Sequence, residues 1–162
     1  MSQARIRKLS AAAMAVTAAL LVAGCGGGTK TTAATSATAT IGSPGDPARA
    51  TRTVEVRAGD DLHFQPEQVA VKVGETVTFK VVNASKVEHE FTLGDATAQA
   101  AHEKQMRSSS SMTMAKDPNA VDVAPGETKE LTWTFAKAGT TLYGCHEPGH
   151  YAAGMKGTVT VT

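Results

Sequence analysis

Short segments in which apolar and polar residues alternate occupy most of the last two thirds of the chain, and they restrict its fold more than any other feature. Examples are TVTFKVVN at 76–83, ELTWTFAK at 130–137 and GTVTVT at 157–162. Turn-forming sequences such as KVGE, APGE and KAGT separate runs of this kind. Alternation with a period of two is typical of strands with one buried face, and several such strands favour a β-sandwich over βαβ units. We therefore predict an all-β domain of antiparallel strands.

One segment, 94–120, interrupts this pattern with the sequence GDATAQAAHEKQMRSSSSMTMAKDPNA. Asp95 can cap a helix, and the Ala-rich run up to about Arg107 predicts a short helix. We expect the Ser- and Met-rich stretch that follows to be mobile and to end at Asp117 and Pro118. The segment is too long for a hairpin loop and is therefore predicted to be a helical insertion between two strands.

The N-terminal residues 1–24 have the layout of a secretory signal. Arg5, Arg7 and Lys8 precede the apolar run AAAMAVTAALLVAG, and no acidic residue is present. A membrane-spanning helix needs about 20 apolar residues, so this run is short for one. We expect export from the cytoplasm. The alternative is a buried N-terminal helix, but the segment that follows offers nothing to pack against it.

The sequence LVAGC at the end of this segment resembles the lipobox of bacterial lipoproteins. The resemblance implies cleavage before Cys25, lipidation of that cysteine, and an anchor on the extracytoplasmic side of a membrane, in the periplasm or at the cell surface. Ordinary cleavage, with Cys25 free or disulfide-bonded to Cys145, is the alternative. Residues 25–50 are rich in Gly, Ala, Thr and Ser and are expected to form a flexible tether. The folded domain is then predicted to span 51–162.

The charge of the mature chain argues against nucleic acid as a partner. The full chain has 16 basic and 15 acidic residues, and residues 1–24 hold three of the basic ones. Removing them leaves 13 basic against 15 acidic residues, a net charge of −2. A nucleic-acid-binding domain needs a basic face, which this balance does not suggest.

The loop YGCHEPGHYAAGMKGTVTV carries residues suited to metal binding: Cys145, His150 and Met155. A thiolate and an imidazole separated by a Pro-Gly turn can converge on one ion, and thiolate, imidazole and thioether together select copper. A second imidazole must come from elsewhere in the fold. Three alternatives remain: a buried structural thiol at Cys145, zinc on Cys145, His146 and His150, and a purely packing role for Met155.

Together with VNASKVEHEF, this loop resembles the cupredoxins, the type 1 blue-copper proteins, and in particular their small bacterial copper-tolerance and electron-transfer members. The resemblance implies a Greek-key β-sandwich that binds one type 1 copper ion. His89, Cys145 and His150 would be the equatorial ligands and Met155 the axial one. Many cupredoxins have Asn, Asp or Ser directly after the first histidine to tie the two ligand loops together, whereas this chain has Glu90. His146 is expected to face solvent or to lie behind the ligands, and the alternative is that it is a fifth ligand.

Electron transfer is the first functional hypothesis. An exposed edge of His150, surrounded by a short apolar rim of Pro148, Gly149, Tyr151, Ala152 and Ala153, would dock a redox partner protein. We expect a monomer and no enzymatic activity, since the sequence has neither the HxH or HCH pairs of multicopper oxidases nor a base-orienting acid for cysteine catalysis.

Copper tolerance, sequestration or delivery is the alternative hypothesis. His102 and Met106 are four residues apart on one helix face, and Met112 and Met114 follow. Imidazole and thioether groups in this order could form an auxiliary Cu(I) site. A surface helix with scattered methionines accounts for the same pattern. His63, flanked by a strand-like run, is expected to be structural.

Overall fold

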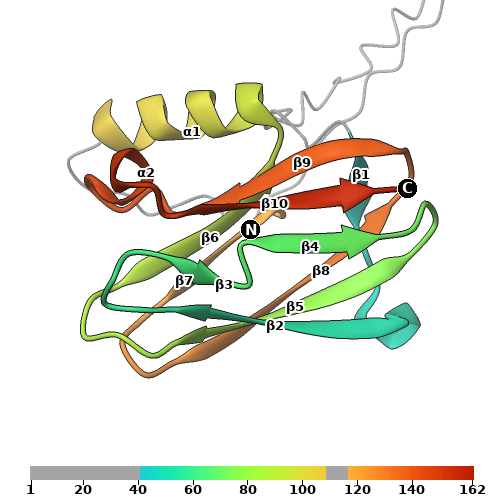
Figure 1. Ribbon diagram of the computed structural model, residues 1–162, viewed down its shortest axis with the longest axis horizontal. Coiled ribbons are helices and arrows are strands. Elements are labelled where there is room, and N and C mark those ends of the chain that lie inside the picture. Colours follow the sequence, from blue (N-terminus) through green and yellow to red (C-terminus); the bar gives the residue numbers. More distant parts are fainter. Residues whose placement is uncertain (1–40, 109–116) are drawn as a thin grey trace, which may run out of the picture. The chain divides into compact units, whose positions relative to one another are not determined.

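The computed structural model describes residues 41–108 and 117–162, which form a sandwich of two five-stranded sheets (Figure 1). The first sheet has the strand order β1 (Gly42–Pro44), β8 (Thr128–Phe135), β5 (Thr76–Asn83), β2 (Arg52–Ala58) and β3 (Phe64–Gln65). The second has the order β4 (Gln68–Val71), β10 (Lys156–Val161), β9 (Gly139–Gly144), β6 (His89–Gly94) and β7 (Ala120–Val123). A short 3-10 helix, η1 (Pro47–Arg49), follows β1. The predicted all-β sandwich is confirmed.

Two strand pairs, β2–β5 and β4–β10, are parallel, although the alternation suggested antiparallel strands throughout. The reason lies in the connections. The chain passes from β3 in the first sheet to β4 in the second and returns to the first sheet with β5. Strands that are joined through the opposite sheet can run in the same direction, whereas a tight hairpin always reverses the chain.

The core lies between the sheets and follows the predicted alternation. Leu131, Trp133 and Phe135 of β8 are buried, and the residues between them are partly exposed. Aromatic rings connect the two layers, as where Phe79 of β5 meets Phe91 of β6 with ring centroids 5.3 Å apart. On the opposite face of β5, Thr78 is also buried, and its side chain forms a hydrogen bond of 2.8 Å with the side chain of Thr132 on β8.

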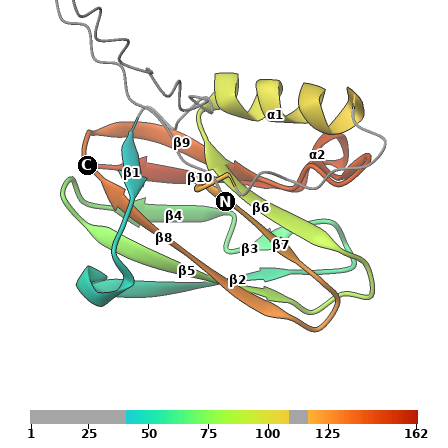
Figure 2. The ribbon, with the colours of Figure 1, turned by 180° about the vertical axis from the view of Figure 1, so that it is seen from behind.

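Helix α1 (Ala96–Ser108) lies over the outer face of the second sheet (Figure 2). The predicted cap is confirmed, since the Asp95 carboxylate accepts a hydrogen bond of 2.9 Å from the backbone N–H of Ala98. Gln99 joins the helix to the sheet by donating to the carbonyl of Thr92 at 2.8 Å. Every residue of β6 is consequently buried, with the core on one face and α1 on the other. The stretch expected to be mobile, 109–116, lies outside the described residues.

The ordered domain begins earlier in the chain than its composition suggested. Ile41 is buried, and the three residues of β1 pair with β8 in antiparallel register. Residues 41–50, which were expected to belong to the tether, are therefore part of the folded domain. Residues 1–40 lie outside the described residues. Within the described ranges, no helix has the length and apolar character needed to span a membrane.

Gly157 in β10 makes a close contact that provides a test of the core. A Cβ atom at this position would overlap the ring of Tyr143, whose hydroxyl donates a hydrogen bond to the Pro66 carbonyl. We expect Gly157→Ala to lower the free energy of unfolding by about 1–3 kcal/mol, because the buried ring has no space to move into. Chemical denaturation measures this. Thr160→Ala, on the exposed side of the same strand, is the control and should change stability little; equal effects of the two substitutions would contradict the prediction.

Candidate metal centre

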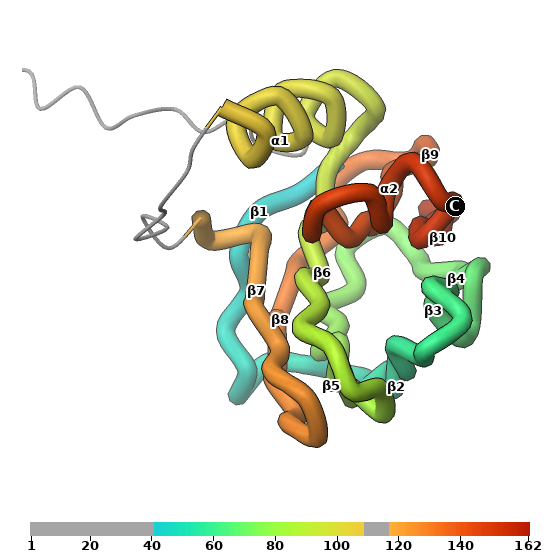
Figure 3. The backbone as a smooth tube through the Cα atoms, turned by 90° about the vertical axis from the view of Figure 1, so that its left-hand side faces the viewer, coloured from blue at the N-terminus to red at the C-terminus, as the bar shows by residue number. Residues whose placement is uncertain are grey.

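Three metal-binding side chains converge near α2 (His150–Ala153). Figure 3 shows this short helix at one end of the sandwich, next to β9 and β6. The donor atoms of His89, Cys145 and His150 all lie within 4.8 Å of one another. The sulfur of Cys145 is 3.3 Å from Nδ1 of His150 and 3.8 Å from Nδ1 of His89. A first-row metal with bonds of about 2.0–2.3 Å to nitrogen and sulfur fits between donors at this spacing.

The loop between β9 and β10 holds three of the four predicted ligands in place through its own backbone. The N–H of Cys145 donates to the carbonyl of Met155 at 3.1 Å, and the N–H of Met155 donates to the carbonyl of His150 at 3.0 Å. Gly149 and Gly154 flank α2 in left-handed conformations that favour glycine. Cys145 and Met155 are fully buried, whereas His150 is partly exposed. One edge of the centre is therefore accessible from outside.

The turn before β6 orients the ring of His89. Ser85 contacts Nε2 of His89 at 2.9 Å, and its hydroxyl proton has two acceptors, Oδ1 of Asn83 at 2.8 Å and the Val87 carbonyl at 3.0 Å. The hydroxyl must then accept a hydrogen bond from Nε2, which leaves the lone pair of Nδ1 facing Cys145. Polar contacts of this kind fix the tautomer of metal-binding histidines. Sequence reasoning missed both residues, although the Asn-x-Ser spacing is typical of a turn closed by side chains.

Glu90 connects the two ligand loops in place of the Asn, Asp or Ser found in many cupredoxins. The side chain of Glu90 is fully buried, and its backbone N–H donates a hydrogen bond to the sulfur of Cys145 at 3.3 Å. Its two carboxylate oxygens accept hydrogen bonds from the N–H of His146 at 3.2 Å and from Nε2 of His102 at 2.7 Å. The link between the loops is thus present, and it also reaches helix α1.

Burial shifts the pKa values of the histidine and cysteine ligands in opposite directions. It lowers the pKa of both His89 and His150, and for His89 the neighbouring His150 lowers the pKa further. Both rings are therefore neutral at neutral pH, with nitrogen lone pairs available. Burial raises the pKa of Cys145 to about 12, so the metal-free protein holds a thiol there. A metal that binds must displace this proton, as is general for cysteine ligands.

His146 lies behind the ligands rather than in solvent. It is buried, and its two ring nitrogens contact Glu103 at 2.7 Å and Gln99 at 2.6 Å, both on α1. Its ring also stacks on Tyr151 with centroids 4.6 Å apart. Because both nitrogens are engaged by the helix, the structure does not support the alternative of zinc bound by Cys145, His146 and His150.

Two of the residues expected to form an auxiliary copper site, His102 and Met106, line different hollows. His102 is buried against β6, whereas Met106 borders a different groove, with Pro148 and Gly149. Met112 and Met114 lie outside the described residues, and so does Cys25. Within the described ranges Cys145 is a free thiol, and His63 is exposed, contacting the carbonyl of Asp61 through Nδ1.

Comparisons with known proteins agree with this geometry. Residues 50–162 match the model of the family described as copper binding proteins, plastocyanin/azurin family. The copper-resistant cuproprotein CopI of Rubrivivax gelatinosus is 46% identical over 120 residues, covering 74% of this chain and 72% of that protein. CopI of Pseudomonas aeruginosa is 41% identical over 149 residues, covering 75% and 82%. The solved structure of auracyanin A, a "blue" copper protein of Chloroflexus aurantiacus, superposes with a TM-score of 0.58 at 31% identity, covering 68% of this chain and 98% of that one.

Proposed function

Because the chain belongs to the plastocyanin/azurin family of copper-binding proteins, we propose that its type 1 copper centre serves copper resistance. The observation that carries this proposal is the convergence of one cysteine sulfur and two imidazoles, with Met155 hydrogen-bonded through its backbone to both loop ligands. This combination of donors selects copper over the hard cations Mg²⁺ and Ca²⁺. Relatives that are 46% and 41% identical carry the name copper-resistant cuproprotein, which favours resistance over the electron-transfer role.

The residues around the pocket account for how one copper ion would be held in either oxidation state. Copper supplies a one-electron redox couple when bound. Ser85 orients His89, Glu90 fixes the sulfur of Cys145, and the backbone of Met155 joins the other two loop ligands. Ligands that are already oriented before metal binding need little movement when the charge of the ion changes.

Electron transfer is the second candidate, favoured by the accessible edge of the centre. His150 is the partly exposed ligand, and the rim beside it contains the exposed small residues Pro148, Gly149, Ala152 and Ala153. A small apolar rim of this type suits the weak, short-lived contact of two redox proteins. The similarity to auracyanin A, described as a blue copper protein, is consistent with this role.

Growth and kinetics separate the two roles. A strain of Rubrivivax gelatinosus without its own CopI would express this chain or its Cys145→Ser variant and be grown in increasing copper. Resistance restored by the chain and not by the variant supports the proposal. If the chain accumulates with copper bound and tolerance does not rise, copper resistance is ruled out as its role.

For electron transfer, Ala152→Asp should slow electron self-exchange between copies while leaving the visible spectrum unchanged.

We also propose that the protein is exported and anchored outside the cytoplasm by lipid on Cys25. The support is the basic start, the apolar run and the LVAGC sequence of the first 25 residues. With the anchor the protein should sediment with membranes, and Cys25→Ser should move it to the soluble extracytoplasmic fraction, since stable anchoring requires the acyl chains. Immunoblots of the two fractions measure this. Ser43→Ala is the control; membrane association that survives loss of Cys25 would refute the anchor.

A further inference from the structure

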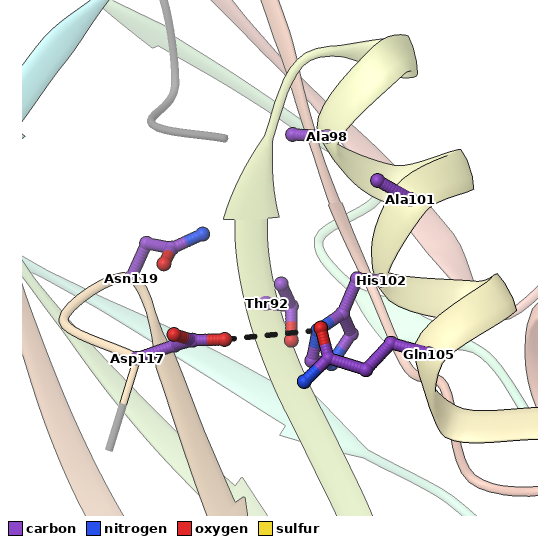
Figure 4. A pocket seen from close by; sticks show the side chains of 7 residues that line it. All are labelled: Thr92, Ala98, Ala101, His102, Gln105, Asp117 and Asn119. Carbon is purple, nitrogen blue, oxygen red and sulfur yellow. Dashed lines mark ion pairs between the residues drawn. The ribbon is translucent and has the colours of Figure 1, made fainter. Parts of the chain in front are cut away.

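A small cavity lies beneath helix α1, on the outer face of the second sheet (Figure 4). Its volume is about 60 Å³, and it is lined by Thr92, Ala98, Ala101, His102, Gln105, Asp117 and Asn119. This volume exceeds the roughly 10–15 Å³ that a cavity needs to hold one water molecule, so there is room for an ion with a water molecule. None of the four copper ligands borders it.

His102 is held in the orientation of a metal-binding histidine. Nε2 lies 2.7 Å from a carboxylate oxygen of Glu90, whose other oxygen already accepts the N–H of His146. Nε2 must therefore donate, which leaves Nδ1 for the cavity, where it is 3.9 Å from Oδ2 of Asp117 (Figure 4). A carboxylate that fixes one nitrogen of a histidine while the other binds a metal is a recurrent arrangement in metalloproteins.

Thr92 provides an independent observation. Its side chain is 2% exposed, and its hydroxyl has no hydrogen-bond partner among the described residues. In Figure 4 this hydroxyl points toward the space between Asp117 and His102. A buried hydroxyl without a partner destabilises the folded state, so a bound species that contacts it would remove this cost.

We propose that this cavity binds a divalent first-row cation, Zn²⁺ or Cu²⁺, through Nδ1 of His102, a carboxylate oxygen of Asp117 and the hydroxyl of Thr92. The donors are one imidazole and two oxygens, which suits these borderline cations better than Cu⁺. Water completes the coordination, as in other sites with three protein ligands. Glu90 and Asp117 supply negative charge that offsets the charge of a dication. The site differs from the type 1 centre in place and in chemistry.

The test uses the full chain already loaded with one copper ion and adds Zn²⁺ in a calorimetric titration. One further Zn²⁺ per chain is expected, and Asp117→Asn and Thr92→Val should each weaken its binding at least about tenfold without changing the visible copper band. His63→Ala, which removes an exposed histidine elsewhere, should leave Zn²⁺ binding unchanged. The titration is done at about pH 8, because the hydrogen bond to Glu90, with Asp117 and Asp122, raises the pKa of His102 despite its burial, and a proton competes for Nδ1.

Thermal unfolding gives a second readout. Zn²⁺ should raise the midpoint of the wild-type chain, because a ligand that binds only the folded state stabilises it. Thr92→Val without Zn²⁺ should be at least as stable as wild type, and Zn²⁺ should no longer raise its midpoint. The proposal is overturned if the copper-loaded chain binds no Zn²⁺, or if bound Zn²⁺ is retained equally by Asp117→Asn and Thr92→Val.

Discussion

Replacement of Cys145 by serine should abolish the intense visible absorption of the copper-loaded protein and weaken copper binding by orders of magnitude. The absorption arises from charge transfer between a thiolate and copper, and a serine hydroxyl is a hard donor that stays protonated at neutral pH. Serine is close to cysteine in size, and its hydroxyl oxygen can accept the hydrogen bonds that the sulfur of Cys145 receives from the backbone of Glu90 and Glu147. The fold should therefore persist while the soft metal site is lost.

Visible spectra and metal content of the purified proteins measure this effect. Cys25→Ser is the matched control, since it removes the other cysteine of the chain and should leave the copper site intact. A Cys145→Ser protein that kept its colour and one firmly bound copper ion would show that the sulfur is not a ligand, and the assignment of the centre would fail.

Glu90→Gln should both destabilise the protein and raise the reduction potential of the copper. The buried carboxylate accepts hydrogen bonds from His102 and from the N–H of His146, and an amide can accept only one of them. Leaving a buried donor unpaired costs about 1–3 kcal/mol. Loss of a negative charge near the centre disfavours Cu²⁺ relative to Cu⁺ by on the order of 1 kcal/mol, or roughly 40 mV for a one-electron couple.

Denaturant unfolding and voltammetry of the copper-loaded protein test the two parts separately. Glu55→Gln, which removes an exposed acid paired with Lys80, is the control and should change neither quantity appreciably. A potential that fell or stayed the same in Glu90→Gln would mean that the carboxylate does not stabilise the oxidised ion. Stability equal to wild type would mean that the link between the loops carries no energy.

The sequence predicts those parts of the fold and site that are determined by residues close together in the chain. The runs 76–83, 130–137 and 157–162 became β5, β8 and β10, because a strand with one buried face records that face in its alternation. Likewise, Cys145, His150 and Met155 lie within one loop, so their spacing alone suggested a metal. His89 needed the resemblance to a family, since it lies on a different strand.

The parts that were missed depend on contacts between distant segments. β1 has the sequence GSP, with no strand propensity, and it exists because it pairs with β8. His102 was expected at the surface of a helix, and it is buried because the face of α1 that carries Ala98, Gln99 and His102 packs on the second sheet. Glu90 gains its contact with His102 from that packing, and its contacts with Cys145 and His146 come from the approach of two distant loops. Spacing along a helix does not indicate which face will be covered.

The contact between α1 and Glu90 has a consequence for how such domains can be remodelled. Without the helix, the glutamate would lose the imidazole of His102 that lies against its carboxylate. Without the glutamate, the helix would retain a buried imidazole N–H that has lost its acceptor. Neither can be grafted onto a related scaffold alone. A chain that gains or loses this insertion must change the residue beside its first copper ligand in the same step.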